Sequence, residues 1–82
     1  MTALITNSYQ IYIGYLETYN LSPKEYPLVR KRQDLMGVVV DSYILLYGEE
    51  NIPQKERSRI AERLEMYDAK WLILPPNENT DK

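Results

Sequence analysis

The chain contains neither cysteine nor histidine among its 82 residues. It can form no disulfide and offers no thiolate or imidazole to a metal ion, so hydrophobic burial has to stabilise the fold. A chain of this length buries somewhat more than about 60% of its unfolded surface, which permits a single domain with a modest core. The same absence removes the thiol nucleophile and the imidazole base of most small catalytic sites.

The charged residues are nearly balanced, with 10 Lys and Arg against 12 Asp and Glu and a net charge of −2. This balance does not by itself require a nucleic acid or a membrane surface as partner. Residues 1–6 lack the basic region and long apolar run of a signal peptide, and no stretch reaches the roughly 20 apolar residues of a membrane span. We therefore expect a cytoplasmic protein.

Apolar residues between positions 4 and 20 recur at spacings of three and four, which collects them on one face of a helix. They are Ile5, Tyr9, Tyr12, Ile13, Leu16 and Tyr19. This pattern predicts a first helix over residues 4–20. A strand near 9–16 is the competing interpretation, because apolar residues also alternate there and tyrosine and isoleucine favour sheets.

A helix start signal follows at Ser22, where the hydroxyl can cap, Pro23 fits the first helical position and Glu25 can reach back to the Ser22 amide. Apolar residues then recur at helical intervals as far as Tyr47. The pattern predicts a second helix over residues 23–47.

Gly37 is the weak point of that second helix, because three β-branched valines follow it directly. If the helix breaks there, residues 38–47 form a buried strand.

Pro53 opens a third segment with helical spacing of its apolar residues. These residues are Ile60, Ala61, Leu64, Tyr67 and Trp71. The pattern predicts a helix over residues 53–72, which Pro75 and Pro76 prevent from continuing. We expect the polar tail, residues 77–82, to be disordered.

Together these segments predict an all-α fold, a compact unit of three helices with short connections in a single domain over residues 1–76. The alternative is a small α/β chain in the order β-α-β-α-β, with strands near residues 9–16, 38–47 and 71–74.

The carboxylates show no arrangement typical of catalysis. Glu49 and Glu50 lie in a polar connection that cannot raise a pKa by burial, and Asp34 and Asp41 lie about two turns apart on the predicted second helix. There is no EF-hand spacing and no glycine-rich phosphate loop. We predict that the protein is not an enzyme and uses no cofactor or metal.

The predicted first helix carries more apolar surface than one core-facing stripe requires, because Leu4, Ile11 and Tyr15 fall on a second face. Tyrosine suits a half-wet contact surface. We therefore predict a small protein–protein interaction module, a regulator, adaptor or inhibitor, that self-associates or docks on another protein through this helix. The expected anchors are Ile11, Tyr12, Tyr15 and Tyr19.

Arg32 falls within the apolar arc of the predicted second helix, where an unpaired charge is costly. We predict that it is a central polar contact of the interface. The competing interpretation is structural, with the side chain extending to the surface or pairing with Glu17 or Asp68.

Four basic residues of the predicted third helix lie within about 80° of one another, opposite its apolar face. They are Lys55, Arg59, Arg63 and Lys70. This stripe predicts an electrostatic surface, and with Arg30 and Lys31 it supports an alternative function as a small nucleic-acid-binding module. A solvated face balanced by neighbouring glutamates is the structural interpretation.

Overall fold

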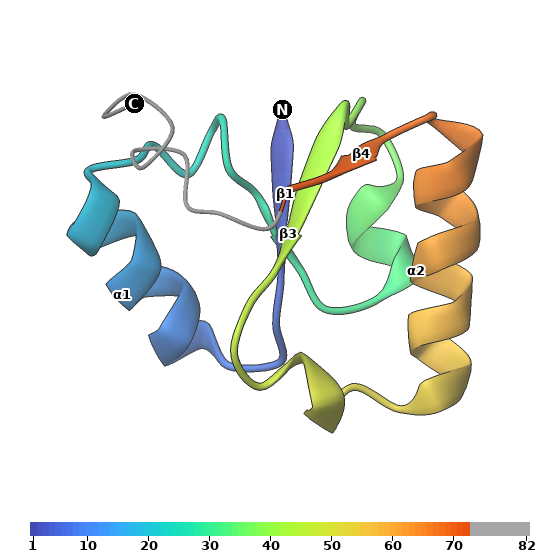
Figure 1. The fold of residues 1–82 in the computed structure, drawn as a ribbon, viewed down its shortest axis with the longest axis horizontal. Coiled ribbons are helices and arrows are strands. Elements are labelled where there is room, and N and C mark those ends of the chain that lie inside the picture. The colour runs from blue at the N-terminus through green and yellow to red at the C-terminus, as the bar shows by residue number, and fades with distance from the viewer. Residues whose placement is uncertain (73–82) are drawn as a thin grey trace.

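The computed structural model describes residues 1–72, which form a four-stranded parallel sheet with helices on both faces (Figure 1). The elements in chain order are β1 (Thr2–Ile5), α1 (Tyr9–Tyr19), β2 (Leu28–Val29), η1 (Arg32–Leu35), β3 (Ser42–Leu45), η2 (Glu49–Asn51), α2 (Gln54–Met66) and β4 (Lys70–Trp71), where η marks a 3₁₀ helix. The strand order is β2-β1-β3-β4.

The all-α prediction is wrong, and the protein is not a helical bundle. The first helix begins at Tyr9 because the preceding residues Thr2–Ile5 form β1. The predicted helix over 23–47 does not exist, since this range contains β2, η1 and β3. Gly37 adopts a φ of +85°, which breaks any helix there.

The alternative order β-α-β-α-β also differs from the structure, although the α/β class it named is the observed one. Residues 9–16 belong to α1, and the first strand lies before them. Strand β3 lies within the predicted range 38–47, and β4 overlaps the predicted range 71–74. Residues 73 and 74 lie outside the described part of the chain. The expected tail, residues 77–82, also lies outside it.

The third predicted helix is present but shorter than 53–72. Helix α2 ends at Met66, and Asp68 then turns the chain with a left-handed φ of +58°. The residues that continued the helical pattern, Lys70 and Trp71, form β4 alongside Ser42 and Tyr43 of β3.

Strand β1 is the centre of the sheet and is buried on both faces. It pairs in parallel with β2 on one edge and with β3 on the other, so that Leu4 lies opposite both Leu28 and Ile44. Ala3 and Ile5 pack toward α2, whereas Leu4 packs toward α1. The three consecutive apolar residues Ala3, Leu4 and Ile5 are typical of a parallel strand that is covered on both faces.

Helix α1 covers one face of this sheet. Its first turn is capped by Ser8, whose Oγ accepts a hydrogen bond from the Ile11 amide at 3.2 Å. It ends at Asn20, which adopts a left-handed φ of 55°. Between these ends, Tyr12 and Leu16 are buried against the sheet.

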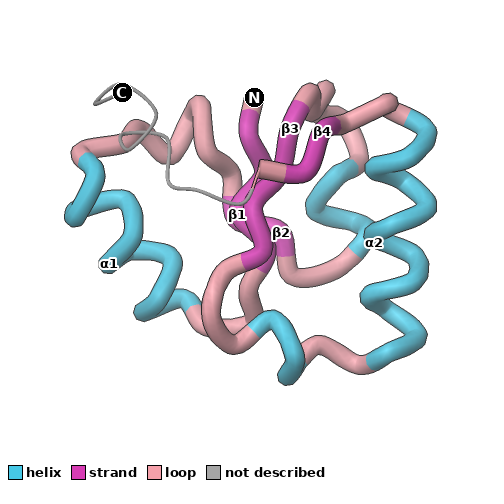
Figure 2. The backbone as a smooth tube through the Cα atoms, viewed as in Figure 1, coloured by secondary structure: helices cyan, strands magenta, loops and turns pink. Residues whose placement is uncertain are grey.

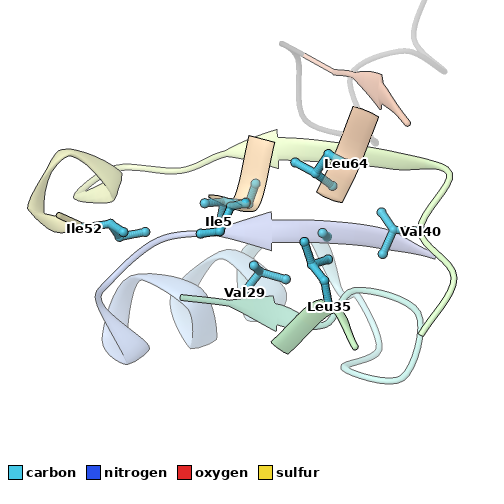
Figure 3. Packing of buried hydrophobic residues seen from close by; sticks show 8 residues of the cluster. Ile5, Val29, Leu35, Val40, Ile52 and Leu64 are labelled. Carbon is cyan, nitrogen blue, oxygen red and sulfur yellow. The ribbon is translucent and has the colours of Figure 1, made fainter. Parts of the chain in front are cut away.

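Helix α2 covers the opposite face, with Ile60 and Leu64 directed inward. This second layer of the core is the larger one, and Figure 3 shows its side chains gathered between the sheet, α2 and the segment around η1. Its fully or almost fully buried members are Ala3, Ile5, Val29, Leu35, Val40, Ile52, Ile60 and Leu64.

Thr6 joins the two loops that leave the centre of the sheet. Its buried hydroxyl donates a hydrogen bond to the Tyr47 carbonyl at 2.7 Å and accepts one from the Ser8 amide at 3.2 Å. Gly48 turns the chain beside it with a φ of +86°. The ends of β1 and β3 are therefore held together where α1 and α2 both begin (Figure 2).

Replacing Thr6 with valine keeps the shape of the side chain but leaves the Tyr47 carbonyl and the Ser8 amide without this partner. We expect the free energy of unfolding to fall by about 1–3 kcal/mol, measured by urea denaturation. The exposed Thr18 on α1 is the matched control, and Thr18→Val changes stability by no more than about 0.5 kcal/mol. Equal effects of the two substitutions would contradict the assigned role of Thr6.

Candidate functional site

The parallel strands bring all their carboxyl ends to one edge of the sheet. From this edge α1 leaves β1 toward one face and α2 follows β3 toward the other, so the connections diverge between β1 and β3. Open α/β sheets bind ligands outside the carboxyl ends of the strands, near such a point. Here Thr6 fills the space between the two loops. One hollow lies on the β2 side, and a second lies beside the end of β3, where Glu49 and Glu50 line it.

Small-molecule sites are usually cavities of about 300–1,000 Å³. The hollow on the β2 side of this edge has a volume of ≈ 530 Å³. It is lined by the second residue after the end of β1, by the two residues that follow β2 and by the start of α2. These residues are Asn7, Arg30, Lys31, Pro53, Lys55 and Glu56. Three separate segments thus meet at one hollow, and two of them bring three cationic side chains to it.

Two carboxylates beside these cations, Asp34 and Glu56, are bonded to the main chain. Asp34 Oδ2 accepts hydrogen bonds from the amides of Arg30 and Lys31 at 2.9 and 3.3 Å. Glu56 Oε2 accepts one from the Arg32 amide at 2.8 Å. Both carboxylates therefore fix the loop after β2 and tie it to α2.

In the described part of the chain, these cations have no carboxylate partner. Within residues 1–72 the one ion pair closer than 4 Å joins the Met1 amino group to Asp41, at 3.4 Å. Arg30, Lys31 and Lys55 are all exposed, and so is Arg32 beside them. Four cations against two carboxylates leave a net local charge of +2 in a chain whose total charge is −2.

The first turn of α2 adds to this positive potential. Pro53 stands at the capping position and has no side-chain acceptor for the amides of the first turn. Free amides and the helix dipole favour an anion at such an end. Together with the three cations, they make this cavity suited to an anionic group.

The structure distributes the predicted anchors of the first helix between core and surface. Tyr12 is 5% exposed and donates a hydrogen bond to the Tyr26 carbonyl at 2.7 Å, so the fold itself uses this side chain. Ile11, Tyr15 and Tyr19 are half-buried, and the rings of Tyr15 and Tyr19 lie 4.8 Å apart. Docking through this helix stays a prediction.

Arg32 does not lie within an apolar arc, because the helix that would have placed it there is absent. It is exposed at the start of η1, and its amide bonds to Glu56. It is therefore positioned beside the cavity rather than in a hydrophobic interface.

The predicted basic stripe does not form as a single row. Lys55 and Arg59 are exposed on α2, but the Arg63 guanidinium lies 5.6 Å from the centre of the Tyr67 ring. Lys70 lies on β4, beyond the end of the helix. Only Lys55 among these four lines the cavity, where it meets Arg30 and Lys31.

Asn7 and Pro53 were not expected at a site, whereas Lys55 was. Arg30 and Lys31 directly follow two apolar residues, a position typical of the end of a strand. That strand, β2, is only Leu28–Val29, which is too short to recognise from the sequence. Without that strand, nothing placed the basic pair at the edge of a sheet.

Comparison of the chain with family models, with curated proteins and with solved structures finds no match. Within residues 1–72, no group of three or more acidic side chains is arranged to hold a metal ion. No helix in the same range is long and apolar enough to cross a membrane.

The burial of Tyr12 predicts a specific loss of stability in alkali. Burial, with a smaller contribution from Tyr9, raises the pKa of Tyr12 above its ordinary value of 10.0. Above pH 10 the unfolded chain releases this proton before the folded one, so the free energy of unfolding falls as the pH rises. Tyr12→Phe removes this contribution and makes the decline between pH 9 and 11 shallower, as measured by urea denaturation at each pH.

At neutral pH the same substitution costs about 1 kcal/mol, because the Tyr26 carbonyl loses its donor. Tyr47→Phe is the control, since Tyr47 is 84% exposed and does not contribute to the raised pKa of Tyr12. An unchanged decline in alkali for Tyr12→Phe would show that this phenol is not held neutral by the fold.

Proposed function

We propose that the protein is a small non-catalytic binding domain that takes a compact phosphate-bearing ligand at the carboxyl edge of its sheet. The observation that carries this proposal is the convergence of Arg30, Lys31 and Lys55 on one cavity of ≈ 530 Å³. The neighbouring carboxylates are bonded to main-chain amides, so the cationic groups are left for a ligand.

Each group has a distinct part in this proposal. The Arg30 guanidinium offers a planar pair of donors that matches two phosphate oxygens, while Lys31 and Lys55 act as point charges. The free amides at the start of α2 complete the set of donors. Asn7 supplies a neutral amide that can bond to the remainder of the ligand.

The size of the cavity and the overall charge favour a small ligand over a nucleic acid. Nucleic-acid-binding domains are usually basic over a whole face, whereas this chain has a pI near 5.0. Its positive potential is local, and the predicted stripe along α2 loses Lys70, which lies on β4. We therefore propose a nucleotide-like or other small phosphate ester as the ligand class.

A non-catalytic role is consistent with the side chains that line the cavity. Glu56 is the one carboxylate among them, and it already accepts the Arg32 amide. The proposal therefore assigns binding and orientation of the ligand to this edge, with no bond-breaking step.

Titration with ADP and with inorganic pyrophosphate tests this function. Calorimetry gives the affinity, and NMR amide shifts locate the site, for which we expect the largest changes at Arg30, Lys31 and Gln54. Binding weakens between about 0.02 M and 0.2 M salt, because exposed charges are screened. Absence of binding by both probes at low salt would overturn the proposal.

Single substitutions distinguish binding at the cavity from non-specific electrostatic attraction. Lys31→Gln and Lys55→Gln each weaken binding by about tenfold, which is about 1.4 kcal/mol. Arg59→Gln removes the same charge from an exposed position on α2 outside the cavity and leaves the affinity within about twofold. Equal losses for the three variants would indicate non-specific attraction.

A further inference from the structure

The lining of the cavity at Arg30, Lys31 and Lys55 is polar almost throughout. Of the six residues that line it in the described part of the chain, only Pro53 is apolar, and none is aromatic. Small-molecule sites are usually lined mainly by apolar and aromatic side chains, with a few polar groups that orient the ligand. A cavity without such side chains suits a ligand that is hydrophilic over its whole length.

The charge of this lining matches that of one phosphate monoester. Three cations and the Glu56 carboxylate give the lining residues a net charge of +2, and a phosphate monoester carries a charge of about −1.5 to −2 near pH 7. A single phosphate group fills only a small part of ≈ 530 Å³, because cavities of about 300–1,000 Å³ enclose whole drug-sized ligands. The remaining space is therefore available to the alcohol that the phosphate esterifies.

Glu56 offers one carboxylate oxygen to that part of the ligand. It lies in the first turn of α2 and is half-buried, and its Oε2 atom accepts the Arg32 amide at 2.8 Å. Within residues 1–72 the other oxygen, Oε1, has no hydrogen-bond partner, and the side chain forms no ion pair. A carboxylate only accepts hydrogen bonds, so Oε1 pairs with a donor such as a hydroxyl and repels a second anionic group.

Asn7 brings a second polar group to the cavity from the end of β1. It is exposed, and among the described residues its side-chain amide has no hydrogen-bond partner. An amide both donates and accepts, so it also pairs with a hydroxyl. Two segments far apart in the sequence thus each add a group that binds hydroxyls to a cavity whose charged members are otherwise cationic.

We infer that the ligand of this cavity is a sugar phosphate, a phosphate monoester of a polyhydroxylated ring. The inference rests on the proposed function and narrows its ligand class. Arg30, Lys31 and Lys55 hold the phosphate. Glu56 Oε1 accepts one ring hydroxyl, and the Asn7 amide bonds to another. A nucleotide fits less well, because its base finds no aromatic side chain to stack on among the described lining residues.

Two ligands of equal charge and ring size separate the contribution of the hydroxyls from that of the phosphate. Ribose 5-phosphate carries ring hydroxyls, and cyclopentylmethyl phosphate lacks them. We expect calorimetry to give at least about tenfold tighter binding of ribose 5-phosphate, because its hydroxyls pair with a charged acceptor. In NMR spectra, the side-chain amide signals of Asn7 shift with ribose 5-phosphate and not with the cyclopentyl analogue.

The outcomes distinguish this inference from the proposed function. A smaller difference between the two ring phosphates overturns the sugar phosphate but leaves a phosphate site. Binding of ADP or pyrophosphate without binding of ribose 5-phosphate has the same meaning. Adenosine 5′-monophosphate that binds more than about tenfold tighter than ribose 5-phosphate overturns the inference in favour of a nucleotide. Absence of binding by every probe overturns the proposed function itself.

Substitution of Glu56 tests the assigned acceptor. Glu56→Ala lowers the preference for ribose 5-phosphate over the cyclopentyl analogue to less than about threefold, whereas Glu62→Ala, at an exposed position of α2 outside the cavity, retains it. Because the preference is a ratio of two affinities, the effect of the lost charge on the phosphate cancels. An unchanged preference in Glu56→Ala contradicts the inference.

Circular dichroism confirms that the variants fold. If Glu56→Ala unfolds, Glu56→Gln takes its place, because it keeps an acceptor for the Arg32 amide. We expect Glu56→Gln to lower the preference at least about threefold, since a neutral amide pairs with hydroxyls more weakly than a carboxylate does. An unchanged preference in this variant contradicts the inference equally.

Discussion

The fold depends on the burial of β1, a four-residue strand covered on both faces and paired on both edges. Its core residues Ala3, Leu4 and Ile5 are at most 2% exposed. Because parallel neighbours require crossover connections, pairing with β2 and β3 sends the chain over both faces of the sheet. The same pairing brings the starts of α1 and α2 to the carboxyl edge. The basic cavity is therefore a consequence of how β1 is paired.

Helical periodicity identified α2 because an amphipathic helix with one buried stripe repeats its pattern over several turns. It failed over 23–47 because the apolar residues there, such as Val38–Val40 and Tyr43–Tyr47, stand at consecutive positions and match almost any period. The capping signal at Ser22 was also misleading. Its carbonyl accepts the amides of Glu25 and Tyr26, each at 3.0 Å, and the segment closes as a turn without continuing into a helix. The turn that the Ser22 signal predicts does form, but the pairing of the following residues, Leu28 and Val29, with β1 prevents a helix from continuing.

The sequence shows which residue types the candidate site contains, but it does not show that these residues lie together. Arg30, Lys31 and Lys55 are evident as basic residues in the sequence, yet they meet only because β2 ends where α2 begins in space. Tyr12 shows the opposite case, since a tyrosine expected at an interface has its hydroxyl satisfied inside the protein by Tyr26. The spacing of apolar residues does not reveal contacts between residues far apart in the chain. It therefore predicted neither the meeting of the three basic residues nor the hydrogen bond of Tyr12.

Both binding proposals require β1 to be the central strand of a parallel sheet, and NMR measures this directly. We predict backbone nuclear Overhauser contacts from Leu4 to both Leu28 and Ile44, and slow amide exchange at Leu4 and Thr6, whose amides bond to the carbonyls of Pro27 and Val29. Helical contacts running through residues 4–8, with no contact from Leu4 to either neighbour, would contradict the account.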